Sequence, residues 1–492
     1  MTTKLSGPVR VRFPPSPTGF LHVGGARTAI YNDLLRHNLG GSFVLRIEDT
    51  DRQRSDAAMT QQIISALEWL GITHDEGPFQ QSDNVDTHRQ AALRLLEEGK
   101  AYHCFHTQEE VTKSREEALA RKENFQYRDY FPELDADAVQ AKLDAGEPYA
   151  IRLRMPREAI EFKDLVRGDV SFPAAGFDDF IILRSDGTPT YHLSVVCDDI
   201  EHGVTHILRG EDHVSNTPKH VVLFEALGAP MPVFGHLPLI MGPNKKRLSK
   251  RTGATSVEEF RDQGILPQAL YNYLALLGWS PGDDREIMTR DDMVEAFTVE
   301  RLVASAAVFD YEKLAWMNAQ YMTREPLDEI IERAQPFLAE QDLTDAPMER
   351  LRPVIDLYRQ RAHNLKELAE FIVPFFREAI DYDPALCKKF LKTEGIADLV
   401  DNLADRYAAL DDYTLESTEA ALRALAEEKE LKAGVLIHPT RMAMTARKAG
   451  PPLFDVVVVM GQEAGVQYMH QFADFLRAMI AQQSEEIAPP TP

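Results

Sequence analysis

The stretch "VRFPPSPTGFLHVGGARTAIYNDLL", residues 11–35, decides the fold. It begins with the alternation of a strand and ends with apolar residues at helical spacing, and between them lie three prolines, Gly19, His22 and the pair Gly24-Gly25. A short strand-to-helix connection needs only one turn signal. Proline removes backbone donors and fixes φ, whereas glycine lets a flat ring or a phosphate approach the backbone. We therefore interpret the stretch as a rigid loop held open around a nucleotide.

His22 stands directly before the expected helix, whose N-terminus favours negative charge. From this position its side chain could donate a hydrogen bond to a phosphoryl oxygen as charge builds up there, without acting as an acid. The alternative is a glycine-rich turn with an incidental histidine. This stretch alone leaves both interpretations open.

Length and composition limit the number of domains and the class of protein. A chain of 492 residues predicts about three to five domains, and 44% apolar residues allow several cores. No apolar run reaches the roughly 18 residues of a membrane span, and the N-terminal "MTTKLSGPVRV" has no apolar signal segment. Cys104, Cys197 and Cys387 are far apart in the sequence, which fits a reducing cytoplasm. The net charge of −24 argues against a polyanionic partner without excluding one, because net charge does not describe a local face.

Strand and helix patterns alternate in the first part of the chain. Residues 42–51 (SFVLRIEDTD) are a short apolar run that ends in acids, typical of a buried parallel strand, and residues 59–72 (MTQQIISALEWLGI) predict an amphipathic helix. The same pattern returns in residues 190–199 (TYHLSVVCDD) and 204–212 (VTHILRGED), which we expect to be strands, before a helix at 216–228. The alternation predicts a Rossmann-like, doubly wound α/β domain that binds its ligands at the carboxyl ends of the strands.

An irregular, charge-rich segment separates the two halves of that domain and predicts an inserted α+β domain. After the second half, residues 255–264 (TSVEEFRDQG) open with a capping box from Ser256 to Glu259, and helical periodicity dominates to about residue 485. Four valines in residues 453–461 (LFDVVVVMG) favour a strand by propensity, but the helical neighbourhood leads us to predict a helix. The protein is thus expected to be multidomain, with an all-α C-terminal half.

A second chemistry-bearing stretch is "PNKKRLSKRTG", residues 243–253. Five of the seven residues 245–251 are basic in a chain that is otherwise strongly acidic. Such a run is often a solvated face or a general phosphate patch. The alternative is a loop whose Lys250 closes on a transferring triphosphate as an electrostatic clamp.

Together the two stretches resemble the paired signatures of class I aminoacyl-tRNA synthetases. "RFPPSPTGFLHVGGARTA", "LRIEDTD", "TYHLSVVCDD", "LRGEDH" and "KRLSKR", in this order, are similar to a bacterial-type glutamyl-tRNA synthetase over nearly the whole chain. The resemblance implies a catalytic domain in residues 1–103 and 191–242, an acceptor-binding insertion in 104–190, a stem-contact domain in 243–322 that includes the basic loop, and anticodon-binding helical domains in 323–380 and 381–492.

The resemblance also implies the chemistry. The family uses ATP and Mg²⁺ to convert glutamate to glutamyl-adenylate, with release of pyrophosphate, and then esterifies the 3′ end of tRNA(Glu). A guanidinium suits the acidic side chain of the substrate, and glutamine would leave a buried arginine unpaired, at a cost on the order of several kcal/mol. The implied glutamate site is Arg12, Pro14, Ser16, Glu48, Tyr191 and Arg209, with Glu48 on the substrate ammonium and Tyr191 closing the pocket. The alternative for Arg12 and Glu48 is an internal salt bridge at the strand ends.

The implied ATP site includes the two groups expected to act in catalysis, His22 and Lys250. The class signature often ends in a second histidine where this chain has Gly25, and glutamate enzymes often carry a small residue there. The full implied set is His22, Gly24, Gly25, Asp212, His213, Ile240, Arg247, Ser249, Lys250 and Arg251.

Some relatives hold a structural zinc after the position of Cys104. Here Cys104 and His106 are present but the later half of that site has neither Cys nor His, and two ligands cannot close a tetrahedral site, so we expect no zinc. Cys197 is expected in the core of a strand, and His236 as a core histidine whose hydrogen bonds are satisfied.

The helical half of the family reads the anticodon. Arg361 matches the arginine that helps to recognise the third anticodon base, with Arg441 and Arg447 as a second tRNA-facing patch. An arginine at 361 indicates an enzyme that rejects tRNA(Gln). The alternative is that Arg361 is an exposed helix residue without a role in recognition. The family suggests a monomer.

Four related functions predict features that differ from those of this chain. A glutaminyl enzyme would carry β-barrel anticodon domains, a shortened relative that modifies a tRNA base would lack the C-terminal half, and a small-metabolite nucleotidylyltransferase would leave that half without a purpose. A non-discriminating enzyme that also charges tRNA(Gln) is an open alternative, as is a tRNA-binding paralogue, which would be expected to have lost His22, Lys250 or the substrate arginines.

Overall fold

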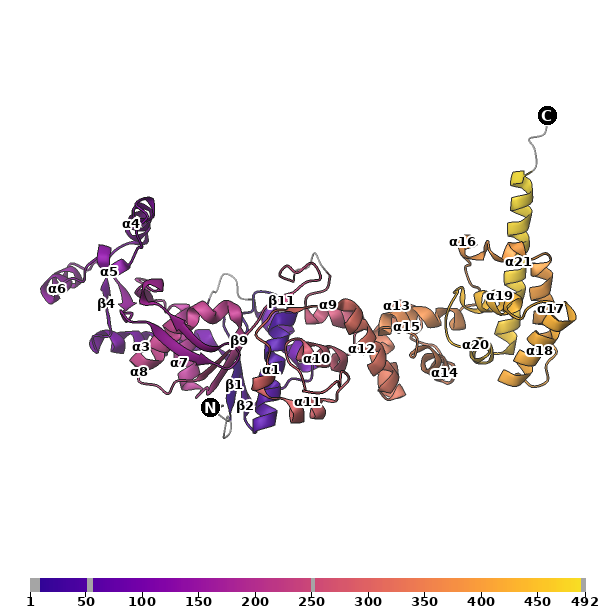
Figure 1. Cartoon of the computed structure of the whole chain (residues 1–492), viewed down its shortest axis with the longest axis horizontal. Helices are drawn as coiled ribbons and strands as arrows, with labels where there is room; N and C mark the ends of the chain where they lie inside the picture. The colour runs from indigo at the N-terminus through magenta and orange to yellow at the C-terminus, as the bar shows by residue number, and fades with distance from the viewer. Residues whose placement is uncertain (1–8, 51–55, 249–252, 488–492) are drawn as a thin grey trace, which may run out of the picture. The chain divides into compact units, whose positions relative to one another are not determined.

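The computed structural model describes residues 9–50, 56–248 and 253–487 of the chain (Figure 1). The chain forms two compact units. One contains Met1–Phe260 and Leu270–Tyr311, and the other contains Arg261–Ala269 and Glu312–Pro492. Within the described residues no helix has the length and apolarity required to cross a membrane.

A mainly parallel sheet forms the centre of the first unit. Three strands pair in parallel in the order β1-β2-β3, and four more have the order β7-β6-β10-β9, with only the β6–β7 pair antiparallel. The Thr205 backbone N–H, just before β9, donates to the Arg10 carbonyl in β1 at 2.9 Å, which brings the two sets of strands side by side. The strands are β1 (Arg10–Phe13), β2 (Ser42–Ile47), β3 (Glu76–Gln80), β6 (Ile160–Asp164), β7 (Gly168–Phe172), β9 (His206–Gly210) and β10 (Val233–Leu237).

Helices connect the parallel strands, as the alternating sequence pattern predicts. The first helix begins after the proline-rich loop and ends at Gly40, whose φ of 66° is a left-handed cap that favours glycine. Strands β2 and β9 are buried along nearly their whole length, as continuous apolar runs in a parallel sheet should be. The connecting helices are α1 (Val23–Leu39), α2 (Ala57–Trp69), α3 (Val85–Glu97), α7 (Tyr191–Glu201) and α8 (Thr217–Leu227).

The prediction of a strand in residues 190–199 is wrong, because this segment forms helix α7. Every side chain from Leu193 to Asp199 is buried, so the helix has no polar face that would reveal a period of 3.6 residues. A fully buried run of this length reads alike as a strand or a helix. Cys197 is therefore a core residue of a helix, not of a strand.

The insertion combines three antiparallel strands with small helices, and it is built into the same unit. The strands are ordered β4-β5-β8, and the hairpin β6–β7, which also lies in this part of the sequence, extends the central sheet beside β10. Ile151 and Ile182 of the insertion pack in one core with Leu193 and Ile207. The further elements are β4 (Ala101–Cys104), α4 (Gln108–Ala120), α5 (Tyr127–Tyr130), α6 (Ala136–Asp144), β5 (Ala150–Leu153) and β8 (Phe180–Leu183).

The chain after the basic stretch is helical, as predicted. The capping box is present, because the Ser256 backbone N–H donates to Glu259 Oε2 at 3.1 Å and the Glu259 N–H donates to Ser256 Oγ at 3.2 Å. Short β11 (Ile240–Met241) pairs with β12 (Ala307–Val308). The helices that follow are α9 (Val257–Asp262), α10 (Pro267–Leu276), α11 (Arg290–Ala296), α12 (Tyr311–Arg324), α13 (Leu327–Glu340), α14 (Met348–Tyr358), α15 (Leu365–Ile372), α16 (Pro384–Cys387), α17 (Ile396–Ala408), α18 (Leu415–Glu428), α19 (Gly434–Thr445), α20 (Leu453–Met460) and α21 (Gln462–Ile487).

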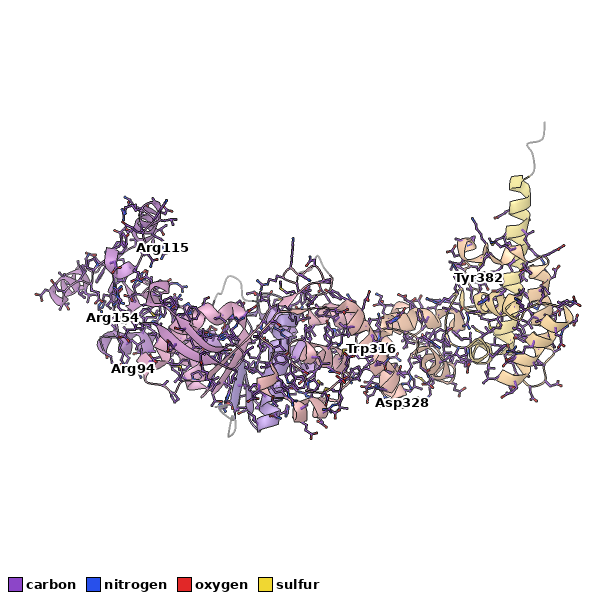
Figure 2. All side chains as sticks on the ribbon, viewed as in Figure 1. Arg94, Arg115, Arg154, Trp316, Asp328 and Tyr382 are labelled. Carbon is purple, nitrogen blue, oxygen red and sulfur yellow. The ribbon has the colours of Figure 1, made fainter. Side chains whose placement is uncertain are left out.

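The prediction of a helix in the valine-rich segment is confirmed by α20. Its buried residues are Leu453, Val456, Val457 and Met460, one helical face at steps of three and four residues. The second unit is further held by Tyr382, which is labelled in Figure 2. Its hydroxyl donates to the Ala443 carbonyl at 2.8 Å. Burial of an apolar face thus overrides the strand propensity of valine.

Candidate active site

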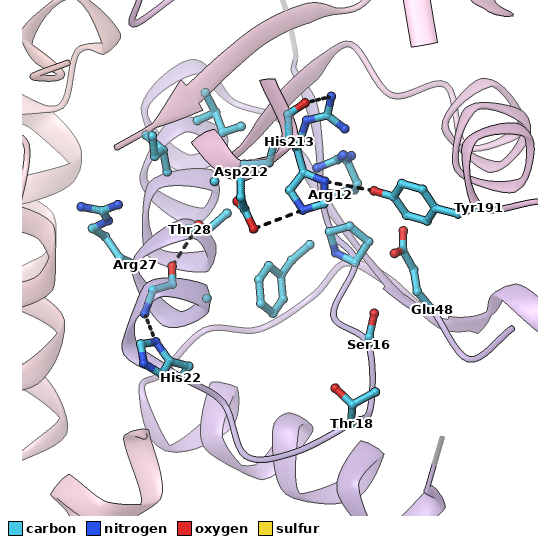
Figure 3. Close-up of a pocket in the computed structure, with 18 of the residues that line it drawn as sticks. Arg12, Ser16, Thr18, His22, Arg27, Thr28, Glu48, Tyr191, Asp212 and His213 are labelled. Atoms are coloured by element: carbon cyan, nitrogen blue, oxygen red, sulfur yellow. Dashed lines mark hydrogen bonds and ion pairs between the residues drawn. The ribbon is translucent and has the colours of Figure 1, made fainter. Parts of the chain in front are cut away.

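A pocket of about 930 Å³ lies where β1, β2 and β9 end. This is the edge of a doubly wound sheet at which ligands bind. All the predicted glutamate and ATP residues that the structure describes line it: Arg12, Pro14, Ser16, His22, Gly24, Gly25, Glu48, Tyr191, Arg209, Asp212, His213, Ile240 and Arg247. Ser249, Lys250 and Arg251 lie outside the described residues. Figure 3 shows His22 at one side of the pocket and Arg12, Glu48 and Tyr191 at the other.

His22 caps the first helix. Its Nδ1 accepts a hydrogen bond from the Gly24 backbone N–H at 3.1 Å. Burial, and then the neighbouring Arg247, lowers the pKa of His22, so its imidazole is neutral at pH 7. Because Nδ1 is an acceptor, the proton of the neutral ring is on Nε2. His22 therefore offers the pocket a fixed N–H donor at a helix N-terminus.

Gly25 fills the position where a second histidine often stands. A Cβ added at Gly25 would lie 3.2 Å from Leu21 Cδ1 and 3.8 Å from Phe13 Cζ. An added Cβ would therefore require the Leu21 side chain to shift slightly, whereas its distance to Phe13 is an ordinary van der Waals contact. The small residue suits the packing of the loop against β1.

Two buried arginines form the opposite wall. Arg12, only 1% exposed, lies 3.4 Å from an oxygen of Asp199, which also accepts from Arg46 Nη1 at 2.8 Å. The Nη1 of Arg12 is buried and has no hydrogen-bond partner among the described residues. An unsatisfied buried donor is costly, so its presence in a pocket indicates a ligand acceptor.

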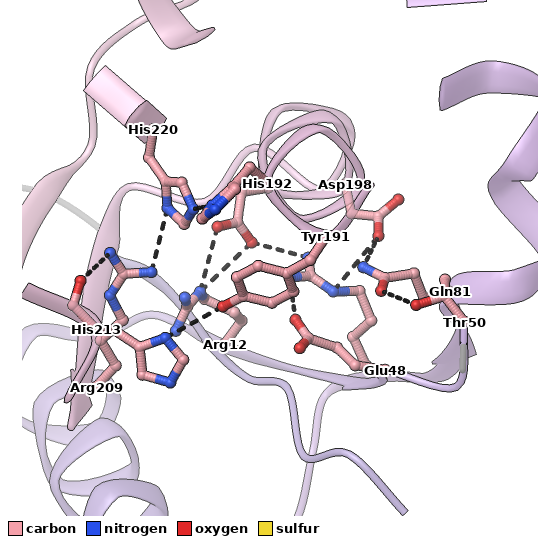
Figure 4. A network of polar contacts seen from close by, with 12 residues as sticks. Arg12, Glu48, Thr50, Gln81, Tyr191, His192, Asp198, Arg209, His213 and His220 are labelled. Atoms are coloured by element: carbon pink, nitrogen blue, oxygen red, sulfur yellow. Dashed lines mark hydrogen bonds and ion pairs between the residues drawn. The ribbon is translucent and has the colours of Figure 1, made fainter. Parts of the chain in front are cut away.

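Arg209 is surrounded by neutral acceptors. Its Nε donates to His236 Nε2 at 3.1 Å, and its Nη2 donates to Thr217 Oγ1 at 2.8 Å. Figure 4 shows its contact with His220, in which Nη1 lies 3.2 Å from Nδ1. No carboxylate in the described part of the chain forms an ion pair with it. Burial, and then Arg12, lowers the pKa of Arg209 to about 10. The guanidinium stays charged at pH 7 and has no directly paired carboxylate within the described residues.

Glu48 is the acid of this pocket. Glu48 Oε1 lies 3.4 Å from Arg46 Nη2, whereas Arg12 pairs with Asp199. The alternative of an ion pair between Arg12 and Glu48 is therefore not what the structure shows, because each has another partner. Burial raises the pKa of Glu48, and the nearby arginines oppose this shift. A cationic group bound beside Glu48 would favour its charged form.

Tyr191, the first residue of α7, closes the same wall. Its hydroxyl lies 3.2 Å from His213 Nδ1. Burial raises the pKa of Tyr191, so its hydroxyl remains protonated and can donate. Tyr191 therefore joins the arginine side of the pocket to the Asp212-His213 segment.

Several residues that line the pocket are not among those predicted from the sequence. Arg27 is buried, and its guanidinium donates to the Leu277 carbonyl at 3.0 Å and to the Pro238 carbonyl. Thr18, Thr28, Gln81, Arg184 and Thr188 also line the pocket. Arg27 and Thr28 follow Gly25 directly, so their place in the opening stretch was the available signal. Gln81 and Arg184 come from distant segments, and no local pattern marks them.

The basic stretch begins as a tight turn on β11. The Gly242 N–H donates to the Lys246 carbonyl at 2.7 Å, and the Leu248 N–H donates to the Ile240 carbonyl at 3.2 Å. Ile240 and Arg247 are thereby placed at the pocket wall. The described part of this stretch fits a loop that enters the pocket.

The three arginines predicted to contact tRNA gather in the second unit. Arg441 and Arg447 both lower the pKa of Tyr358, although burial raises it more, and Arg361 lowers the pKa of Arg441 after burial. Residues distant in sequence thus form one basic cluster around Tyr358. Arg447 also stacks on the Phe371 ring at 4.2 Å.

Cys104 and His106, the two residues that match a zinc site of some relatives, both contact a tyrosine. The Tyr127 hydroxyl lies 2.9 Å from Cys104 Sγ and 2.8 Å from His106 Nδ1. Cys104 is buried, and His106 is half-buried. In the described residues no group of three or more His, Cys, Asp or Glu side chains is arranged to hold a metal.

His236, expected to be a satisfied core histidine, is fully buried and hydrogen-bonded through both ring nitrogens. That prediction is confirmed. Its partners, Asp164 and Arg209, connect it to the pocket wall, a link that the apolar run around it did not reveal.

Comparison with known proteins decides the family. Residues 8–316 match the model of the catalytic domain of class I tRNA synthetases (E and Q), and residues 329–471 match an anticodon binding domain. The chain is 41% identical to glutamate–tRNA ligase 1 of Caldanaerobacter subterraneus subsp. tengcongensis, with 96% of this chain and 99% of the relative covered. The chain belongs to the glutamate–tRNA ligase family.

Other members agree. Glutamate–tRNA ligase 2 of Koribacter versatilis is 43% identical, again over 96% of this chain and 99% of the relative. The crystal structure of a glutamate tRNA ligase from Elizabethkingia meningosepticum, in complex with its amino acid, has a TM-score of 0.86 and 32% identity, and covers 95% of this chain and 99% of that one. The predicted class I fold, a Rossmann-like catalytic domain with a helical anticodon-binding half, is thereby confirmed.

This family member should lose stability in mild acid. Burial lowers the pKa of His192 and of His213 to about 4, from about 6.5 in an unfolded chain. Between these values the unfolded state takes up protons that the folded state does not, so the free energy of unfolding falls as pH falls from about 6.5 to about 4. Urea unfolding at pH 7.5, 6.0 and 5.0 measures this slope. His192→Gln should make it shallower, and an unchanged slope would contradict the assignment to this histidine.

Proposed function

We propose that the protein activates glutamate with ATP and transfers the glutamyl group to the 3′ end of tRNA(Glu). The observation that carries this proposal is the pairing, in one pocket, of two groups: a buried arginine that forms no ion pair with a carboxylate of the described residues, and a histidine donor at a helix N-terminus. The first suits a carboxylate, and the second suits a phosphate. Family membership supplies the reaction that joins the two.

In this proposal Arg209 and the free Nη1 of Arg12 hold the side-chain carboxylate of glutamate. Tyr191 adds a neutral hydroxyl donor, and Glu48 takes the substrate ammonium. Pro14 and Ser16, in the loop after β1, line the pocket beside these side chains. Glutamine offers no charge to Arg209, so the desolvated guanidinium would remain unpaired, which gives discrimination.

ATP would lie along the start of α1. Gly24 and Gly25 admit the nucleotide to the backbone, Asp212, His213 and Ile240 line the far wall, and the 247–251 segment supplies cations. An α-carboxylate oxygen of glutamate attacks the α-phosphorus, the bond to the β-phosphate oxygen breaks, and pyrophosphate leaves. His22 Nε2–H donates to a phosphoryl oxygen as its charge grows, so it stabilises the transition state without transferring a proton.

In the second step a terminal ribose hydroxyl of tRNA attacks the glutamyl carbonyl and AMP leaves. Mg²⁺ is expected to arrive on the triphosphate, where it would neutralise charge. Its ligands would be mainly nucleotide oxygens and water, since the described residues hold no ready-made metal cluster.

The remaining assignments extend this proposal. Residues 104–190 would bind the acceptor end, 243–322 the stem, and 323–380 with 381–492 the anticodon. A monomer in a reducing cytoplasm is consistent with three free, buried cysteines. The domain limits are those implied by the family.

The deciding experiment is transfer of radiolabelled glutamate to purified tRNA(Glu) and tRNA(Gln) with ATP and Mg²⁺. We expect charging of tRNA(Glu) alone, and its loss in Lys250→Ala. Charging of neither tRNA by the native protein would reject the proposal in favour of a tRNA-binding paralogue.

Arg361 is expected to exclude tRNA(Gln). Arg361→Ala should lower the ratio of kcat/KM for tRNA(Glu) to that for tRNA(Gln) by about tenfold or more, since one specific base contact contributes about 1–3 kcal/mol. Arg352→Ala is a matched control, because Arg352 is an arginine of the same region that pairs with Asp328. If the native protein charges both tRNAs, the enzyme is non-discriminating and this role of Arg361 is refuted.

We also propose that the protein needs no structural zinc. Metal analysis of protein purified without chelators should find substoichiometric zinc, and EDTA should leave the melting temperature unchanged, because the Tyr127 hydroxyl already binds Cys104 and His106. Stoichiometric zinc would contradict this.

A further inference from the structure

A buried chain of polar groups runs from the insertion to the substrate pocket. Asp164, the last residue of β6, accepts a hydrogen bond from His236 Nδ1 at 2.5 Å, and His236 Nε2 accepts from Arg209 Nε at 3.1 Å. All three side chains are at most 5% exposed. Neither Asp164 nor His236 lines the pocket, so neither can touch a ligand there directly.

The hydrogen bonds determine where the proton of His236 resides. Arg209 Nε–H is always a donor, so the facing Nε2 of His236 must be unprotonated. The single proton of the neutral ring is then on Nδ1, where Asp164 accepts it. Burial lowers the pKa of His236, although Asp164 opposes this, which agrees with a neutral ring at pH 7.

The carboxylate of Asp164 is itself fixed in orientation. Its Oδ1 accepts from the backbone N–H groups of Val166 and Arg167, both at 2.9 Å, which leaves Oδ2 for His236. The hairpin that follows β6 therefore holds the acid in the one arrangement that selects the required tautomer of His236.

A second histidine completes the cradle. His220, fully buried in α8, presents Nδ1 to Arg209 Nη1 at 3.2 Å, and its Nε2 lies 3.2 Å from His192 Nδ1 (Figure 4). To accept from Arg209, His220 must also be neutral. Arg209 is thus held by neutral acceptors on two sides, and its positive charge is not cancelled by a directly bonded carboxylate.

We propose that Asp164 and His236 are positioning residues that hold Arg209 as a carboxylate receptor, with His236 kept as a neutral acceptor so that the charge of Arg209 remains available to the substrate. A direct Arg–Asp pair would fix the guanidinium equally well but would neutralise it. With His236 between Asp164 and Arg209, the guanidinium is held in a fixed orientation and its positive charge is not neutralised. This inference rests on the proposed role of Arg209 in binding glutamate.

Asp164→Asn is the sharpest test, because the change is nearly isosteric. The two backbone donors keep an oxygen at the Oδ1 position, so the new NH₂ group faces His236 Nδ1 and forces the ring proton to Nε2, against Arg209 Nε–H. An amide opposite a histidine selects the wrong tautomer with the geometry otherwise intact. We expect the KM for glutamate to rise about tenfold or more, with the KM for ATP within about twofold of the native value.

The double variant tests whether Asp164 acts through His236. In His236→Gln the amide can rotate to present its oxygen to Arg209 whatever stands at 164, so Asp164→Asn should add little to the glutamate KM in that background. His206→Gln, a buried histidine at the start of β9, is the matched control and should leave both KM values unchanged. The melting temperature of each variant is measured alongside.

Each outcome decides between explanations. An unchanged glutamate KM in Asp164→Asn, an equal rise in the KM for ATP and for glutamate, or additive effects in the double variant would overturn the proposal, since each indicates a merely structural role. Arg209→Gln in the same assay tests the underlying assumption that Arg209 binds the glutamate carboxylate. If it too leaves the glutamate KM unchanged, Arg209 is not the receptor and both assignments fail, whereas a large effect of Arg209→Gln with none of Asp164→Asn rejects the positioning role alone.

Discussion

Arg209→Gln is expected to reduce kcat/KM for glutamate by roughly 100- to 4,000-fold, equivalent to about 3–5 kcal/mol for removal of one partner of a buried charged pair. The physical reason is that the guanidinium is buried, charged at pH 7 and free of a carboxylate partner among the described residues. The substrate carboxylate would be its only counter-ion. Aminoacylation kinetics at saturating ATP and tRNA measure the loss, which should fall mainly on the KM for glutamate.

Two controls sharpen this expectation. Arg209→Lys keeps the charge but loses the planar fork that bonds His236, Thr217 and a carboxylate at once, so it should lie between the native protein and the glutamine variant. The preference for glutamate over glutamine should also shrink in Arg209→Gln, because an amide no longer leaves a cation unpaired. Unchanged discrimination would contradict the assignment.

His22→Asn is expected to reduce kcat by about 100- to 1,000-fold while the KM values change little. Asparagine is a good helix N-cap and its oxygen can replace Nδ1 as the acceptor for the Gly24 N–H, but its short side chain cannot reach the position of Nε2. The variant therefore keeps the helix and loses only the donor to the phosphoryl oxygen.

The comparison with His22→Ala separates catalysis from stability. Alanine removes both the donor and the cap, which should lower the free energy of unfolding by a further ~1 kcal/mol relative to asparagine, with a similar loss of kcat. Single-turnover rates and urea unfolding give the two quantities. Full activity of His22→Asn would show that His22 serves only as a cap.

The catalytic half was predictable because its chemistry is concentrated in short motifs. Thirteen residues that the motif resemblance implies line a single pocket, since the carboxyl ends of parallel strands meet at one edge of the sheet. Helix α20 was predicted from its helical neighbourhood, against the strand propensity of four valines, and in the fold its buried residues recur at steps of three and four. Local pattern and topology are sufficient for such features.

Helix α7 was not predictable in the same way. All side chains from Leu193 to Asp199 are buried, so the sequence shows no polar face recurring with the helical period. The acids Asp198 and Asp199 at the end of this run therefore resemble the polar end of a buried strand. In the fold these acids are buried partners of His88, Arg46 and Arg12. Their role depends on hydrogen-bond and ion-pair partners supplied by β1, β2 and α3, which no local window contains.

By itself the sequence determined the family, the order of strands and helices apart from α7, and residues that line the pocket, because these follow from motifs and short-range periodicity. Only the tertiary structure decided which charges are already paired. It assigned Asp199 to Arg12, gave Arg209 neutral histidines in place of a carboxylate, and brought Asp164 from the insertion to His236. Pairing and burial depend on distances between segments far apart in the sequence, such as the 187 residues between Arg12 and Asp199, and those distances exist only once the chain has folded.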